Sequence, residues 1–150
     1  MEFDKKKSFT CGWRFGDLFS EEGFHVTMVR LGYREWWNEQ KVIEQLQKLS
    51  TQTYFRVVRY DYFGKERKNP VLVVEFVNQQ LNKEVKKIYD SIRYPRNTIW
   101  KKPFYKVEFH ISFWEKIDER NKFQVGDILH AKSFFIKKEK SDDVIFSMEI

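Results

Sequence analysis

The chain repeats one short pattern in which a histidine precedes a hydroxyl residue by two positions. The stretches FHVT, at residues 24–27, and FHIS, at residues 109–112, both place a phenylalanine before the histidine and an aliphatic residue after it. They contain two of the three histidines of the chain. The third, His130, is followed two positions later by Lys132, and we assign it no catalytic role.

Two imidazoles and two hydroxyls are sufficient for phosphodiester chemistry without a metal. An imidazole has an unperturbed pKa of about 6.5, so one ring can accept a proton from an attacking hydroxyl or water while the other donates a proton to the leaving oxygen. Hydroxyl groups can donate hydrogen bonds to the non-bridging phosphate oxygens. We therefore take His25, His110, Thr27 and Ser112 as candidate catalytic residues and leave open which histidine is the acid.

Strand geometry explains why the spacing matters. Side chains two positions apart in a strand point to the same face, so His25 lies beside Thr27 and His110 beside Ser112, while their apolar neighbours face a core. If the two strands meet across a cleft, all four groups converge. A single His-x-Ser/Thr pattern often arises by chance, but two copies on two expected strands are much less common.

The elements that must position these residues can be read from hydrophobic periodicity. Apolar residues at helical spacing predict helices at 38–50 and 81–92, the second ending before Pro95. Each helix follows a strand and leads back to one, which predicts helices packed on sheets in an α/β or α+β arrangement. The order also divides into two strand-helix-strand half-units, each with one copy of the pattern. Strands are expected at 8–15, 24–32, 53–63, 70–77, 104–114, 127–139 and 143–150.

Bulk properties narrow the class of protein. A chain of 150 residues, 18% of them aromatic, fits one packed domain covering residues 1–150. The net charge of +6 favours polyanionic partners such as nucleotides. A single cysteine, Cys11, excludes an intramolecular disulfide and a thiolate zinc cluster. No apolar run is long enough to span a membrane, and the first residues do not resemble a signal peptide, so we expect a cytoplasmic protein.

The two motifs, His25-Val26-Thr27-Met28 and His110-Ile111-Ser112-Phe113, resemble the signature of the two-histidine (2H) phosphoesterase superfamily. The similarity extends through the central strands at 54–77 and the closing strands at 123–150. It implies an α+β, bilobal fold with pseudo-twofold symmetry, in which two antiparallel sheets flank a central cleft and the helices lie outside. It also implies catalysis without a cofactor or metal.

Members of this superfamily act on ribose 2′ linkages or cyclic phosphates. The compact chain is similar to a branch, with viral members, that degrades 2′-5′ oligoadenylate and so counteracts antiviral RNase L signalling. This resemblance makes 2′-5′ oligoadenylate the favoured substrate. The protein would act as a monomer, or as a domain of a larger protein, in the cytoplasm of a host cell and without contact with a membrane. Candidate substrate-binding residues are Trp114 and Lys116, which continue the His110 face by strand alternation, and Arg30, Tyr33 and Tyr105 near the motif ends.

Two alternatives remain open. The same four residues would also suit a phosphodiesterase acting on 2′,3′-cyclic nucleotides or RNA ends, because the motif recognises the phosphate and not the base. A non-catalytic RNA-binding module would fit the basic charge and the aromatic strands, but it would leave the paired histidines unexplained.

Overall fold

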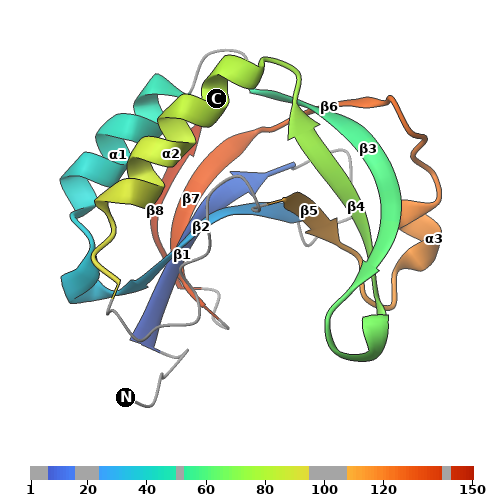
Figure 1. The fold of residues 1–150 in the computed structure, drawn as a ribbon, viewed down its shortest axis with the longest axis horizontal. Coiled ribbons are helices and arrows are strands. Elements are labelled where there is room, and N and C mark those ends of the chain that lie inside the picture. Colours follow the sequence, from blue (N-terminus) through green and yellow to red (C-terminus); the bar gives the residue numbers. More distant parts are fainter. Residues whose placement is uncertain (1–6, 16–23, 50–52, 95–107, 140–142) are drawn as a thin grey trace.

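The protein folds into one curled antiparallel sheet with few helices, an α+β architecture. The structure is a computed structural model that describes residues 7–15, 24–49, 53–94, 108–139 and 143–150. Within these residues eight strands form a single sheet in the order β6-β3-β4-β5-β2-β1-β7-β8, and Figure 1 shows how strongly this sheet bends. The strands are β1 (Ser8–Arg14), β2 (His25–Tyr33), β3 (Tyr54–Phe63), β4 (Asn69–Phe76), β5 (Phe109–Ser112), β6 (Ile128–His130), β7 (Ser133–Lys138) and β8 (Val144–Glu149).

Three α-helices accompany the sheet in the described segments: α1 (Glu39–Lys48), α2 (Asn82–Ser91) and the short α3 (Ile117–Arg120). Helix α1 begins where the side chain of Asn38 accepts a hydrogen bond from the backbone N–H of Lys41, as expected for an N-cap. Helices α1 and α2 lie side by side, and α2 contacts β2 (Figure 1). Helix α3 lies at the other end of the molecule, beside β4. None of the helices in the described residues is long and apolar enough to cross a membrane.

The core lies on one face of the sheet, beneath α1 and α2. Trp13 is fully buried at its centre, and its indole contacts the rings of Phe55, Phe76, Phe109 and Phe134 edge-on or tilted at 4.9–5.9 Å between centroids. Aromatic pairs favour such edge-to-face geometry. Five rings from five strands thus hold the curl of the sheet together.

Most of the expected elements are confirmed, and one segment is corrected. The segment 127–139 was expected to form one strand, but it forms two, β6 and β7, which are not neighbours in the strand order of the sheet. Between them the backbone N–H of Ala131 donates to Thr53 and that of Lys132 donates to Arg14. The chain therefore crosses from β3 to β1 within two residues. Of the strand expected at 104–114, residues 109–112 form β5, and residues 104–107 lie outside the described part.

The expectation of two sheets flanking a cleft is wrong. Strands β2 and β5, which carry the two motifs, pair with each other at Val26 and Ile111 and join the halves into one sheet. Four strands lie on the β5 side of this seam and four on the β2 side. The physical reason is that a strand edge left unpaired beside the core would expose backbone groups, whereas pairing β2 with β5 satisfies them.

Candidate active site

The two motifs meet at the centre of the sheet. Because β2 and β5 are antiparallel and Val26 pairs with Ile111, the same register sets His25 beside Ser112 and Thr27 beside His110. Val26 and Ile111 are fully buried in the core, so the four polar side chains lie on the opposite face. The two histidines are diagonal neighbours, a placement that sets residues about 7–8 Å apart and their Cβ atoms somewhat closer. We call His25, Thr27, His110 and Ser112 the four-residue cluster.

The floor around this cluster is apolar. Val71 and Val73 of β4 pair with Ser112 and His110, and both valines are buried although they do not belong to the core beneath the helices. Phe135 of β7 is likewise fully buried outside that core. A polar cluster set on such a floor is partly shielded from water, which strengthens electrostatic interactions within it.

His25 is held neutral at physiological pH. Its ring contacts Phe135 edge-on at 5.6 Å between centroids. Burial, and to a lesser extent the charges of Lys137, Arg14 and His110, lower the pKa of His25 from 6.5 to about 4. Each of these causes disfavours the imidazolium. A neutral imidazole can accept a proton, so His25 is suited to the work of a general base.

Two cations that the sequence motifs do not indicate, Arg14 and Lys137, lie on the same face as this cluster. Arg14 pairs with His25 across β1 and β2, and its guanidinium lies over the ring of Phe135 at 5.1 Å from the centroid. Lys137 reaches the same face from β7, where it acts on the charge of His25. Two cations beside a histidine and a hydroxyl can hold an anionic phosphate.

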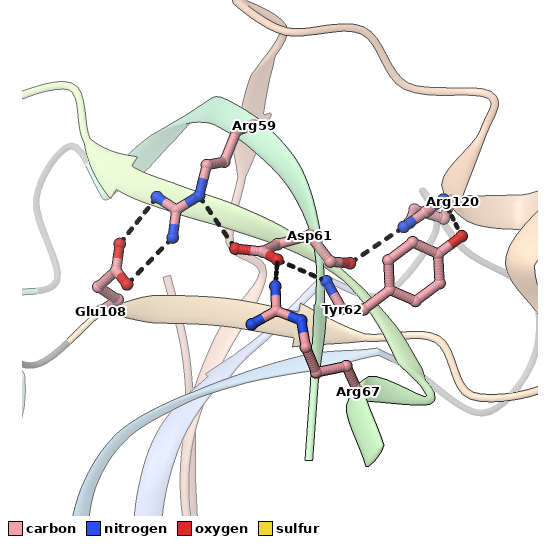
Figure 2. Close-up of polar contacts among 6 residues, drawn as sticks. All are labelled: Arg59, Asp61, Tyr62, Arg67, Glu108 and Arg120. Carbon is pink, nitrogen blue, oxygen red and sulfur yellow. Dashed lines mark hydrogen bonds and ion pairs between the residues drawn. The ribbon is translucent and has the colours of Figure 1, made fainter. Parts of the chain in front are cut away.

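His110 lies in a different electrostatic setting. Its ring packs edge-on against Phe63 at 4.8 Å between centroids. Glu108, two residues earlier on the chain, forms a bidentate ion pair with Arg59 at 2.8 and 3.1 Å, shown in Figure 2. Hydrogen bonds from Arg59, together with the nearby charge of His110, hold the pKa of Glu108 below its usual value. An ionised carboxylate therefore lies near His110, whereas cations surround His25.

The Glu108–Arg59 pair is the end of a longer charge network along β3. Arg59 also donates to Asp61 at 3.2 Å, and Arg67 donates to the other Asp61 oxygen at 2.7 Å (Figure 2). Buried Arg120 of α3 donates to the backbone oxygen of Asp61 at 3.1 Å. The network fixes Glu108 and ties α3 to the sheet.

Ser112 is oriented by a buried amide. The Nδ2 atom of Asn69 donates to Ser112 Oγ at 2.9 Å, and the Asn69 side chain is 5% exposed. Because a serine hydroxyl has one proton and two acceptor sites, a bond received from Asn69 leaves the Ser112 proton for another acceptor. Ser112 can therefore donate a hydrogen bond to a phosphate oxygen.

A pocket of about 200 Å³ opens at the end of the cluster. It is lined by Phe24, His25, Ser112, Phe113, Trp114, Glu115 and Lys116. Trp114 and Lys116 were expected there because strand alternation would continue past Ser112, but β5 ends at Ser112 and this reason is wrong. A turn brings both residues to the pocket instead. Lys116 lies with its ammonium 5.7 Å from the centroid of the Phe24 ring.

Comparisons with known proteins were made on sequence and on structure. No family model and no curated protein matches the sequence. Among solved structures, Usb1 of Kluyveromyces marxianus is similar over 97% of this chain and 99% of its own, with 8% identity and a TM-score of 0.49. A structure described as a phosphoesterase is similar over 96% and 98%, with 10% identity and a TM-score of 0.44.

The remaining residues expected at the site lie elsewhere or outside the described part. Arg30 lies further along β2, where its guanidinium pairs with Glu139. Tyr33, at the end of β2, packs on Trp36 at 4.7 Å between ring centroids. Neither lines the pocket beside the four-residue cluster, so closeness in sequence to the motif does not bring them to it. Tyr105 lies outside the described residues.

Two residues that were given no catalytic role lie away from the cluster. His130 stacks on Tyr54 at 4.5 Å in the edge strand β6. Cys11 is fully buried in β1, and burial raises the pKa of its thiol to about 12. In the part of the chain that the structure describes, no three His, Cys, Asp or Glu side chains are placed to hold a metal ion.

Proposed function

We propose that this protein is a metal-independent phosphodiesterase in which His25 and His110 act as general base and general acid on a single phosphate. The observation that carries the proposal is the register of β2 and β5, which places two histidines diagonally and a hydroxyl beside each of them. This diagonal placement, with residues about 7–8 Å apart and Cβ atoms somewhat closer, lets two rings reach opposite sides of one phosphorus.

The electrostatic difference between the histidines supports an assignment of roles. His25 is neutral near pH 7 because burial and two cations oppose its charge, so it takes the proton from the attacking ribose hydroxyl or water. The attacking oxygen forms a bond to phosphorus while the bond to the leaving oxygen breaks. His110, near the carboxylate of Glu108, gives its proton to that leaving oxygen. Each turnover thus moves one proton onto His25 and one away from His110.

The hydroxyls and cations complete the site. Thr27 and Ser112 donate hydrogen bonds to the non-bridging oxygens, whose charge grows in the transition state. Arg14 and Lys137 neutralise the phosphate from the β1 and β7 side. Trp114, which is 63% exposed at the pocket, provides an aromatic surface on which a nucleobase stacks.

The exposed indole favours a substrate that carries a base next to the phosphate, and 2′-5′ oligoadenylate is the substrate we propose. The test is a panel of 2′-5′ triadenylate, 3′-5′ triadenylate, a cyclic dinucleotide and 2′,3′-cyclic AMP, incubated in EDTA with product analysis. Turnover of 2′-5′ triadenylate in EDTA supports the proposal. Turnover of 2′,3′-cyclic AMP alone contradicts the proposed linkage and identifies a cyclic phosphodiesterase. Binding without any turnover contradicts the proposal as a whole and favours an RNA-binding module.

A further inference from the structure

The turn that follows β5 has an unusual conformation at an exposed tryptophan. The backbone N–H of Lys116 donates to Phe113 O at 2.8 Å, which closes a four-residue turn over residues 113–116. Its second residue, Trp114, has φ of 52°. Turns with positive φ at this position normally have glycine there, because a side chain is crowded in that conformation.

Packing of the indole into the core does not explain this strain. The Trp114 side chain is 63% exposed, beside the pocket that contains His25 and Ser112. A bulky residue in a strained conformation persists only where its surroundings hold it, and such residues gather at functional sites. The conformation of Trp114 therefore depends on the groups that hold it.

One buried amide contacts both Trp114 and Ser112. Asn69 Oδ1 accepts a hydrogen bond from the Trp114 backbone N–H at 3.3 Å, while Asn69 Nδ2 donates to Ser112 Oγ at 2.9 Å. Asn69 is the first residue of β4, is 5% exposed, and pairs with Phe63 of β3. The planar side-chain amide of Asn69 therefore fixes the turn at Trp114 and the Ser112 hydroxyl relative to each other, through its acceptor and its donor.

The far end of the same segment is also anchored. Lys116 leads into α3, whose Arg120 donates to Asp61 O and lies over the Tyr60 and Tyr62 rings, 5.1 and 4.9 Å from their centroids. With α3 tied to β3, the turn at 113–116 is held on both sides. The near end is held by the hydrogen bonds from the Phe113 N–H to Pro70 O at 3.0 Å and from the Trp114 N–H to Asn69 Oδ1.

We propose that Asn69 is a positioning residue that holds Ser112 as a phosphate donor and Trp114 as the stacking surface for the neighbouring base. This inference rests on the proposed phosphodiesterase function and adds a specificity element to it. Because one amide sets the spacing between the two groups, it selects substrates in which a base lies at that fixed distance from the scissile phosphate.

Two substitutions at Asn69 separate the two contacts. Asn69→Asp keeps an acceptor for the Trp114 N–H but loses the donor to Ser112, and its carboxylate would accept the Ser112 proton instead. We expect kcat to fall about tenfold or more, because Ser112 no longer donates a hydrogen bond to the phosphate in the transition state, with KM close to the wild-type value. Asn69→Ala removes both contacts, so kcat should fall and KM should rise together.

Two substitutions at Trp114 isolate the indole. Trp114→Ala should raise KM about tenfold, the cost of one lost base–aromatic stack, with kcat close to wild type. Trp114→Gly should raise KM similarly but also raise the melting temperature, because glycine adopts a φ of 52° without strain. The matched control is Thr53→Ala, which removes another buried side-chain hydrogen bond, from Thr53 to Leu49 O, at the opposite end of β3.

The kinetics use whichever panel substrate the wild type cleaves fastest, so failure of the two proposals can be told apart. A wild type with no turnover contradicts the phosphodiesterase function itself. An active wild type whose Asn69→Asp and Asn69→Ala variants match Thr53→Ala in kcat and KM contradicts the role of Asn69. Amide hydrogen exchange at Trp114 gives a readout besides activity: exchange should accelerate in Asn69→Ala and stay slow in Asn69→Asp. Equal exchange in the wild type and in Asn69→Ala would overturn the proposed hydrogen bond.

Discussion

Replacing His25 with glutamine should remove the contribution of His25 to the pH dependence of the free energy of unfolding. The pKa of His25 is lowered from 6.5 in the unfolded chain to about 4 in the folded protein. Above pH 6.5 the residue is neutral in both states, and its contribution to stability is fully present. As the pH falls towards 4, the unfolded state binds a proton that the folded state does not bind, so the free energy of unfolding decreases.

The magnitude follows from the two pKa values. Linkage gives a loss of about 2 kcal/mol at pH 5 and about 2.5 kcal/mol at pH 4.5, relative to neutral pH, when RT is about 0.59 kcal/mol. These losses in the free energy of unfolding are upper limits, because His25 is only partly buried. His25→Gln retains a polar side chain of similar size and has no titrating group, so its stability should fall less over the same range.

The assay is urea unfolding of both proteins at pH 7.5 and pH 4.5. Subtracting the change in the variant from the change in the wild type cancels the contributions of all other titrating groups that the substitution does not perturb. His130→Gln, in the edge strand β6, is the matched histidine control. Identical pH dependence in the wild type and in His25→Gln would refute the claim that His25 is held neutral.

Three further predictions concern the site and its support. The acid limb of log(kcat/KM) against pH should lie near pH 4 in the wild type. In Lys137→Gln it should move to higher pH, because one charge opposing the imidazolium is gone. An acid limb at the same pH in both proteins would contradict this arrangement. In steady-state kinetics, Thr27→Ala and Ser112→Ala should each lower kcat by less than either histidine substitution does, because they remove a hydrogen bond and not a proton transfer. A larger loss of kcat than in the histidine variants would contradict these roles. Gly12→Ala should lower the free energy of unfolding by about 1–3 kcal/mol, since a Cβ there would lie 2.0 Å from the Val26 carbonyl oxygen; an unchanged urea midpoint would show that β1 can move away from β2.

Local patterns in the sequence predicted the elements well. Alternation at residues 24–28 and 109–113 correctly placed Val26 and Ile111 in the core and the histidines on the other face. Helical spacing located α1 and α2, whose stripes bury Val42, Leu46, Val85 and Ile88. The type of an element and the face that it buries depend on residues within a few positions of one another, and hydrophobic periodicity reflects this local arrangement.

Pairing between distant strands could not be read from the sequence. The expected cleft between two sheets proved to be one sheet, because alternation fixes the face of a strand and not its partner. For the same reason Arg14, Lys137 and Asn69 were missed: each reaches the cluster through a pairing or a hydrogen bond between distant segments. Arg30 and Tyr33 adjoin the motif in sequence, but neither lines the pocket beside the cluster.

The turn at Trp114 shows a further limit. Nothing in the residue types at 113–116 predicts a positive φ at a tryptophan, since local propensity disfavours it. The hydrogen bonds from Phe113 to Pro70 O and from Trp114 to Asn69, together with the anchoring of α3, hold that conformation. Tertiary contacts of this kind override local preference at functional sites.

The most direct test of the two-histidine mechanism is the turnover rate of the wild type, His25→Ala and His110→Ala on 2′-5′ triadenylate in EDTA, with circular dichroism to confirm that each variant is folded. The account predicts that the wild type cleaves the substrate in EDTA and that each substitution lowers kcat at least about a hundredfold. Cleavage that survives the loss of both histidines, or that EDTA abolishes, would contradict it.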